Sequence, residues 1–167
     1  LPLKNYAFDL EAIVKSGTEK TKIIYLANPN NPTGSIFTRT QFDWFMSRVP
    51  DYVTVILDEA YCQYCENEPE YPNGLEYEYD NLIVTRTFSK AYGLGGLRVG
   101  FAAGPERLIS AISKVKLPFE PNHLAQVGAL AALTDYEFLK LTQIVNERSI
   151  RQFEEGFDRL GISHIKT

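Results

Sequence analysis

The most informative segment of the 167-residue chain is the almost continuous apolar run YVTVIL at residues 52–57. Such a run is typical of a β-strand that is covered on both faces, as the strands of parallel sheets are. The segment KIIYLA at residues 22–27 also has strand character, because it is β-branched and aromatic. Between them, Thr38 and Gln41 have the spacing of a capping box that opens a helix with apolar positions 42, 45, 46 and 49 on one face. We therefore expect a β–α–β unit.

Further elements are predicted on both sides of this unit. Asp9 can cap a short helix, and strands are expected at residues 82–85 and 97–103. Only about ten residues separate these two strands, which is short for a parallel crossover, so the second should run antiparallel. The sequence thus predicts an α/β fold, a three-layer arrangement around a mostly parallel sheet with one antiparallel strand.

Three helices are expected after the last strand. One begins at Pro105, a second covers residues 122–133, and helical spacing continues from Thr134 to a stop at Gly161. A helix of roughly 25 residues is nearly 40 Å long at about 1.5 Å per residue. We expect this helix, at residues 135–161, to link two domains.

Composition and charge exclude several classes of protein. The hydrophobic share of 44% and the charged share of 23% are ordinary for a globular chain. The net charge of −4 leaves no basic excess for a nucleic-acid backbone. No apolar run approaches the roughly 18 residues of a membrane span, so we expect no membrane partner and a cytoplasmic location. The segment 66–80, with six acidic residues and no Lys or Arg, is predicted to be a solvated loop.

The candidate chemical groups follow predicted strands. Asp58 ends the apolar strand, at the edge where open α/β sheets bind ligands. Lys90 follows the hydroxyl residues Thr87 and Ser89 in a glycine-rich segment that also contains Arg98. A lysine that attacks a carbonyl must be neutral, and a nearby guanidinium favours the neutral form, so these residues could form a phosphate-anchored Schiff-base site.

Other interpretations of the same residues remain open. Asp58 could simply cap a helix, and Lys90 could be a surface lysine on a turn. The pattern VILDE at residues 55–59 is also that of a Walker B strand, with Asp58 on magnesium and Glu59 activating water in an ATPase. No phosphate-binding P-loop motif occurs, and Arg98 stands where a dinucleotide fingerprint needs Gly or Ala.

Three segments together resemble the fold-type-I pyridoxal-phosphate aminotransferases, most closely the histidinol-phosphate aminotransferase branch. They are NPNNPTG at 28–34, LDEAY at 57–61 and TFSKAYGLGGLRVG at 87–100. The resemblance implies the large-domain fold and the cofactor pyridoxal 5′-phosphate. Lys90 would bond to the cofactor and carry the substrate proton, and Asp58 would pair with the pyridine nitrogen. Asn31 and Tyr61 would bind the cofactor's phenolic oxygen, and the phosphate would be held by Thr87, Ser89 and Arg98.

The implied reaction converts histidinol phosphate and 2-oxoglutarate into imidazole acetol phosphate and glutamate, in histidine biosynthesis. Alternatives in the same family are a threonine-phosphate decarboxylase and another amino-acid aminotransferase, and a different class is a regulator whose aminotransferase-like domain senses the cofactor. The family usually forms homodimers. Residues 1–134 would be part of the large domain and 162–167 the start of a small one, so we expect a fragment that binds cofactor weakly and turns over slowly.

The two cysteines form the single pair CQYC at residues 62–65. A zinc site needs further ligands, and the two histidines, His123 and His164, are far along the chain. We expect reduced thiols and no metal site.

Overall fold

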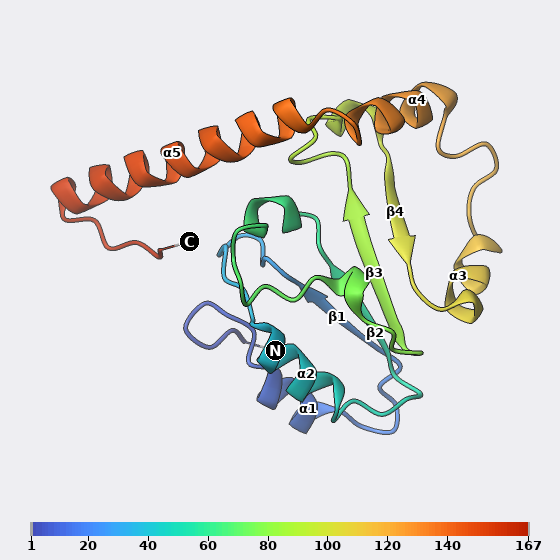
Figure 1. Cartoon of the computed structure of the whole chain (residues 1–167). Coiled ribbons are helices and arrows are strands. Elements are labelled where there is room, and N and C mark those ends of the chain that lie inside the picture. Colours follow the sequence, from blue (N-terminus) through green and yellow to red (C-terminus); the bar gives the residue numbers. More distant parts are fainter. Residues whose placement is uncertain (1, 167) are drawn as a thin grey trace.

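The computed structural model describes residues 2–166, so the first and last residues of the expected domain ranges lie outside the described part. Four strands form one sheet in the order β1 (Ile23–Ala27), β2 (Thr54–Asp58), β3 (Leu82–Thr87) and β4 (Gly100–Ala103) (Figure 1). The first three are parallel, and β4 is antiparallel to β3. The mostly parallel sheet with one antiparallel strand is therefore confirmed.

The β–α–β unit is also confirmed. α2 (Arg39–Met46) begins at Thr38, and the capping box with Gln41 is complete. Phe42 and Phe45 on its inner face are fully buried against the sheet residues Leu26, Val55 and Leu57. α1 (Leu10–Ser16), capped by Asp9, lies beside α2 on the same face (Figure 1).

Burial along β2 differs from the expectation of a strand covered on both faces. Val55 and Leu57 are completely buried, whereas Thr54, Ile56 and Asp58 on the opposite face are half-buried. The reason is that α1 and α2 both pack on one face of the sheet. The other face of β2 leaves room beside the Asp58 carboxylate.

β4 begins later than the predicted start at Leu97. Residues Gly95–Leu97 form a short 3₁₀ turn, and Arg98 has a left-handed backbone with φ of 54°. The ladder starts only where Gly100 pairs with Thr87. A Cβ at Gly100 would lie 2.6 Å from the Arg86 carbonyl oxygen, so a glycine is needed for this close approach.

The chain after the sheet is helical. α3 (Glu106–Ser113) follows Pro105, α4 (His123–Ala132) is capped by Asn122, and α5 covers Tyr136–Leu160 and ends at Gly161, whose φ is 65°. The predicted long helix is thus confirmed, and in Figure 1 it extends away from the sheet. Within residues 2–166 no helix is long and apolar enough to cross a bilayer.

α5 is attached to the 3₁₀ helix η1 (Cys62–Cys65), which follows β2. The side-chain Nε2 of Gln143 donates to the Gln63 carbonyl at 2.6 Å and to a carboxylate oxygen of Glu66 at 2.9 Å. These two hydrogen bonds hold the amino-terminal half of α5 next to the segment that follows the carboxyl end of β2.

The expectation of a solvated loop at residues 66–80 is wrong for its middle. Tyr71, Pro72 and Gly74 are buried, and Gly74 begins the 3₁₀ helix η2 (Gly74–Glu76). The Tyr71 hydroxyl donates to the Asn28 carbonyl at 2.5 Å, and the Gly74 N–H donates to Glu59 at 2.6 Å. These two hydrogen bonds hold the acidic segment against the sheet.

Candidate active site

A cavity of about 380 Å³ lies at the carboxyl ends of β1 and β2. In the parallel register Ala27 is the partner of Asp58, so the segments that follow the two strands meet at one edge of the sheet. The side chains of Asn31, Asp58, Tyr61 and Lys90 all line the cavity. The structure therefore brings four of the predicted site residues together.

The carboxylate of Asp58 is held at both oxygens. Its Oδ1 accepts the N–H of Ala60 at 3.0 Å, and its Oδ2 accepts the hydroxyl of Tyr25 from β1. Partial desolvation of the phenol, together with the hydrogen bond to Asp58 and the charge of Asp58, raises the pKa of Tyr25 to about 12. Tyr25 is therefore a neutral hydrogen-bond donor at physiological pH.

Asn31 reaches the cavity from the proline-rich loop after β1. Its Nδ2 donates to the Tyr61 hydroxyl at 3.3 Å. The loop is fixed by buried Asn28, whose side chain bonds both the N–H and the carbonyl of Phe37, at 2.9 and 3.3 Å. Lys90 completes this side of the cavity, with its Nζ 5.3 Å from the centre of the Tyr61 ring.

Three predicted residues lie outside the lining of this cavity. Thr87 Oγ1 accepts the N–H of Ser89 at 3.0 Å and so shapes the turn that leads to Lys90. Arg98 is exposed and donates to the Gly95 carbonyl at 2.9 Å. Thr87, Ser89 and Arg98 thus belong to the segments around Lys90 and β4, without touching the Asp58 end of the cavity.

Sequence reasoning missed Tyr25. The signal that could have found it is strand alternation: Tyr25 precedes Ala27 by two residues, so it projects on the same face as Ala27 and its partner Asp58. Finding it requires the register of the two strands, which the sequence alone did not provide.

Glu59 has a different environment from the neighbouring Asp58. Its side chain is fully buried, and one carboxylate oxygen accepts hydrogen bonds from Nε and one Nη of Arg86, at 2.8 and 2.6 Å. The other oxygen accepts the Gly74 N–H. A carboxylate enclosed in this way has no access to a water molecule, so the geometry does not support the ATPase interpretation, in which Glu59 activates water.

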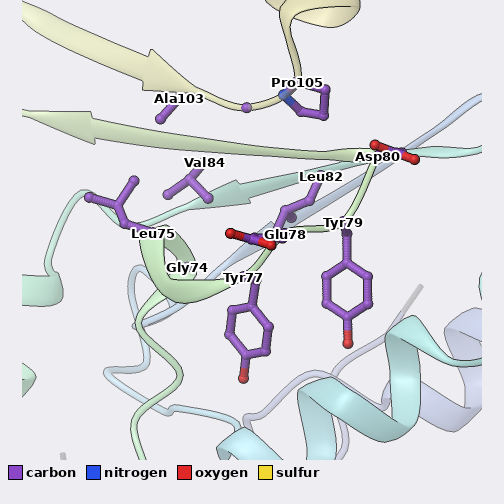
Figure 2. A pocket seen from close by; sticks show the side chains of 11 residues that line it. Gly74, Leu75, Tyr77, Glu78, Tyr79, Asp80, Leu82, Val84, Ala103 and Pro105 are labelled. Carbon is purple, nitrogen blue, oxygen red and sulfur yellow. The ribbon is translucent and has the colours of Figure 1, made fainter.

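A second cavity of about 350 Å³ lies at the amino end of β3, whereas Lys90 follows the carboxyl end of that strand (Figure 2). Tyr77, Tyr79, Leu82 and Pro105 contribute to its wall, as Figure 2 shows. The charged side chains among its described lining residues are Glu78 and Asp80, both acidic. It offers no amine or guanidinium for a carbonyl or a phosphate, so the chemistry of the predicted site belongs to the Lys90 cavity.

Comparison with known proteins agrees with this geometry. The family model described as aminotransferase class I and II matches residues 2–167. Histidinol-phosphate aminotransferase 2 of Hydrogenovibrio crunogenus is 50% identical over 99% of this chain and 44% of its own length. The histidinol-phosphate aminotransferase of Caldicellulosiruptor saccharolyticus is 41% identical over 100% of this chain and 47% of its own. The chain thus spans somewhat less than half the length of these relatives.

The fold comparison gives the same result. The crystal structure of histidinol-phosphate aminotransferase from Sinorhizobium meliloti, in complex with pyridoxal-5′-phosphate, superposes with a TM-score of 0.89 and 29% identity. The match covers 99% of this chain and 46% of that one. On the family match and the shared fold together, this chain belongs to the class I and II aminotransferases.

Proposed function

We propose that this chain holds pyridoxal 5′-phosphate in the Lys90 cavity and takes part in transamination between histidinol phosphate and 2-oxoglutarate. One observation carries the proposal: a single cavity is lined by the amine of Lys90, the carboxylate of Asp58 and the hydrogen-bonded pair of the Asn31 amide and the Tyr61 phenol. The relatives that cover the whole chain are named histidinol-phosphate aminotransferases, which supports the choice of reaction.

The donor set fits this cofactor. A primary amine suits its aldehyde, a carboxylate suits its pyridine nitrogen, and the Asn31–Tyr61 pair offers hydrogen bonds to its ring hydroxyl. We assign these contacts to Lys90, Asp58 and the Asn31–Tyr61 pair. The phosphate is assigned to Thr87, Ser89 and Arg98, since Arg98 presents a fixed fork of donors from a strained backbone position.

The cofactor, when bound, supplies an electron sink for the charge that develops at the substrate Cα. We assign to Lys90 the transfer of the proton between the substrate Cα and the cofactor C4′, because its Nζ is the basic group of the cavity. Asp58 contributes a carboxylate whose orientation is fixed by Ala60 and Tyr25. Tyr61 and Asn31 hold each other in place, which reduces the entropy lost when the pair binds the ring hydroxyl of the cofactor.

The wider organisation is part of the same proposal. We assign residues 1–134 to the cofactor-binding large domain, 135–161 to the helix that links it to a second domain, and 162–167 to the start of that domain. Assembly as a homodimer and a cytoplasmic location remain predictions from the sequence.

A spectroscopic experiment tests the function. Pyridoxal phosphate is added to the protein, and the visible band of the lysine-bound cofactor is followed in the native chain, in Lys90→Ala and in Lys116→Ala, an exposed lysine outside the cavity. We expect the band in the native chain and in Lys116→Ala only. Equal bands in all three proteins would refute the proposal.

Substrate choice is tested by the next addition. Addition of histidinol phosphate should remove the visible band of the lysine-bound cofactor, and addition of 2-oxoglutarate should restore this band. Carbon dioxide release from threonine phosphate would instead identify the decarboxylase, and a cofactor band that no amino donor changes would contradict the proposed transamination.

A further inference from the structure

We propose that Tyr25 is a positioning residue, whose hydroxyl fixes the Asp58 carboxylate for its contact with the cofactor's ring nitrogen. The inference rests on the proposed function of the Lys90 cavity. It assigns a role to a residue that lies outside all three sequence segments on which the family resemblance depends.

Two hydrogen bonds hold the Asp58 carboxylate. The Ala60 N–H holds Oδ1, and the Tyr25 hydroxyl holds Oδ2. One bond on each oxygen fixes the rotation of the carboxylate about its terminal side-chain torsion, which is otherwise broad. Without the Tyr25 hydroxyl, a single bond from the backbone remains, and the carboxylate is free to turn.

Both partners stand on rigid elements. Tyr25 lies within β1, where its register partner is Ile56, and Asp58 is the last residue of the adjacent strand β2. The two strands share a parallel ladder, so the hydroxyl and the carboxylate keep their relative position. A site built on paired strands is held more precisely than one built on loops.

The surroundings give Tyr25 the role of donor. Apart from Asp58, the charged side chain among the described residues that line the cavity is Lys90, and the remaining polar ones are Asn30, Asn31 and Tyr61. A carboxylate only accepts hydrogen bonds, so the phenol donates. Partial desolvation of the phenol, with the nearby Asp58, raises the pKa of Tyr25 to about 12, so the phenol does not become a second anion in the cavity.

A purely structural role for the hydroxyl is not favoured by packing. Tyr25 is 55% exposed and is absent from the core that α1 and α2 form on the sheet. The opposite face of β1 supplies Leu26 to that core. Removing the Tyr25 hydroxyl should therefore change cofactor binding more than folding.

Tyr25→Phe tests the inference against Tyr52→Phe. The control loses a phenol of similar exposure, 57%, which lies next to Lys22 and outside the cavity. We expect Tyr25→Phe to weaken the binding of pyridoxal phosphate on the order of tenfold, as loss of a hydrogen bond to a charged group predicts. Tyr52→Phe should bind as the native protein does, and both variants should keep the native thermal midpoint.

A second measurement does not use the cofactor. Native protein and Tyr25→Phe are prepared with ¹³Cζ-labelled tyrosine, and the resonance that is missing from the variant is assigned to Tyr25. In the native protein this resonance should still report a protonated phenol about one pH unit above the ordinary tyrosine pKa of 10.0. Equal cofactor affinity in Tyr25→Phe and the native protein would overturn the inference and leave the proposed function intact. Failure of the native protein to bind cofactor would overturn both.

Discussion

Arg86 and Glu59 form a buried ion pair beneath the candidate active site, with an Arg86 Nη 2.6 Å from a Glu59 oxygen. Arg86 comes from β3, Glu59 directly follows β2, and the second Glu59 oxygen binds Gly74 of the acidic segment. Burial raises the pKa of Glu59, and the Arg86 charge opposes that shift. The pair joins three separate stretches of chain immediately behind Asp58.

The first prediction concerns loss of the Arg86 charge. Arg86→Met leaves the fully buried Glu59 carboxylate without its cation, which typically costs about 3–5 kcal/mol. Urea unfolding monitored by circular dichroism measures this loss. Arg39→Met removes the cation of the exposed Arg39–Glu76 pair and should cost far less. A similar loss of unfolding free energy in both variants would show that the buried Arg86–Glu59 pair contributes no more to stability than the exposed pair does.

The second prediction concerns Gly74. A Cβ on this residue would lie 2.8 Å from Val84 Cγ2 and 2.9 Å from both Glu59 Oε1 and Leu57 Cδ2. Gly74→Ala should therefore destabilise the fold by about 1–3 kcal/mol, as overpacking does. Gly156 lies within α5, and an added Cβ there meets nothing within 4 Å, so Gly156→Ala should stabilise the helix by up to about 1 kcal/mol. Opposite shifts in the thermal midpoint are expected, and a neutral Gly74→Ala would contradict the described packing.

The fold was largely predictable because its signals are local. The α2 capping box depends on two residues three positions apart, and the 25-residue α5 ends at a glycine with positive φ, as its sequence pattern indicates. The start of β4 was mispredicted because Leu97 has strand character, whereas Arg98 adopts a left-handed backbone that its residue type rarely takes. The buried middle of the acidic segment was missed because its partner, Glu59, lies 15 residues earlier.

The candidate site was only partly predictable. Asn31, Asp58, Tyr61 and Lys90 occur in recognisable motifs, and the carboxyl-edge rule of parallel sheets places them together. The Tyr25–Asp58 hydrogen bond joins residues 33 positions apart and depends on strand register, for which the sequence has no local signal. Long-range pairing therefore set the limit of the sequence analysis.

The third prediction concerns alkaline stability. The folded-state pKa of Tyr25 is raised from 10.0 to about 12, so the unfolded chain loses this proton first as the pH rises. This difference has no effect on stability below pH 10, and it destabilises the folded state as the pH rises from 10 towards about 12. Guanidinium unfolding in steps across this window should show a steeper decline for the native protein than for Tyr25→Phe. Parallel declines would contradict the raised pKa.

The fourth prediction concerns the two thiols of η1. Burial raises the pKa of Cys62 to about 12 and that of Cys65 to about 11. Because the thiolate is the reactive form, both should react slowly with Ellman's reagent near pH 8. Unfolding in guanidinium should release two rapidly reacting thiols. Rapid reaction of the folded protein would show that η1 opens readily or that the thiols are less buried than described.

The most direct test of the account is to locate the covalent bond between the protein and the cofactor. The protein is treated with pyridoxal phosphate, reduced with borohydride, digested and mapped by mass spectrometry. We predict one modified lysine, Lys90, and no corresponding modification in Lys90→Ala. Modification spread evenly over the exposed lysines, and unchanged in Lys90→Ala, would contradict the assignment of this cavity.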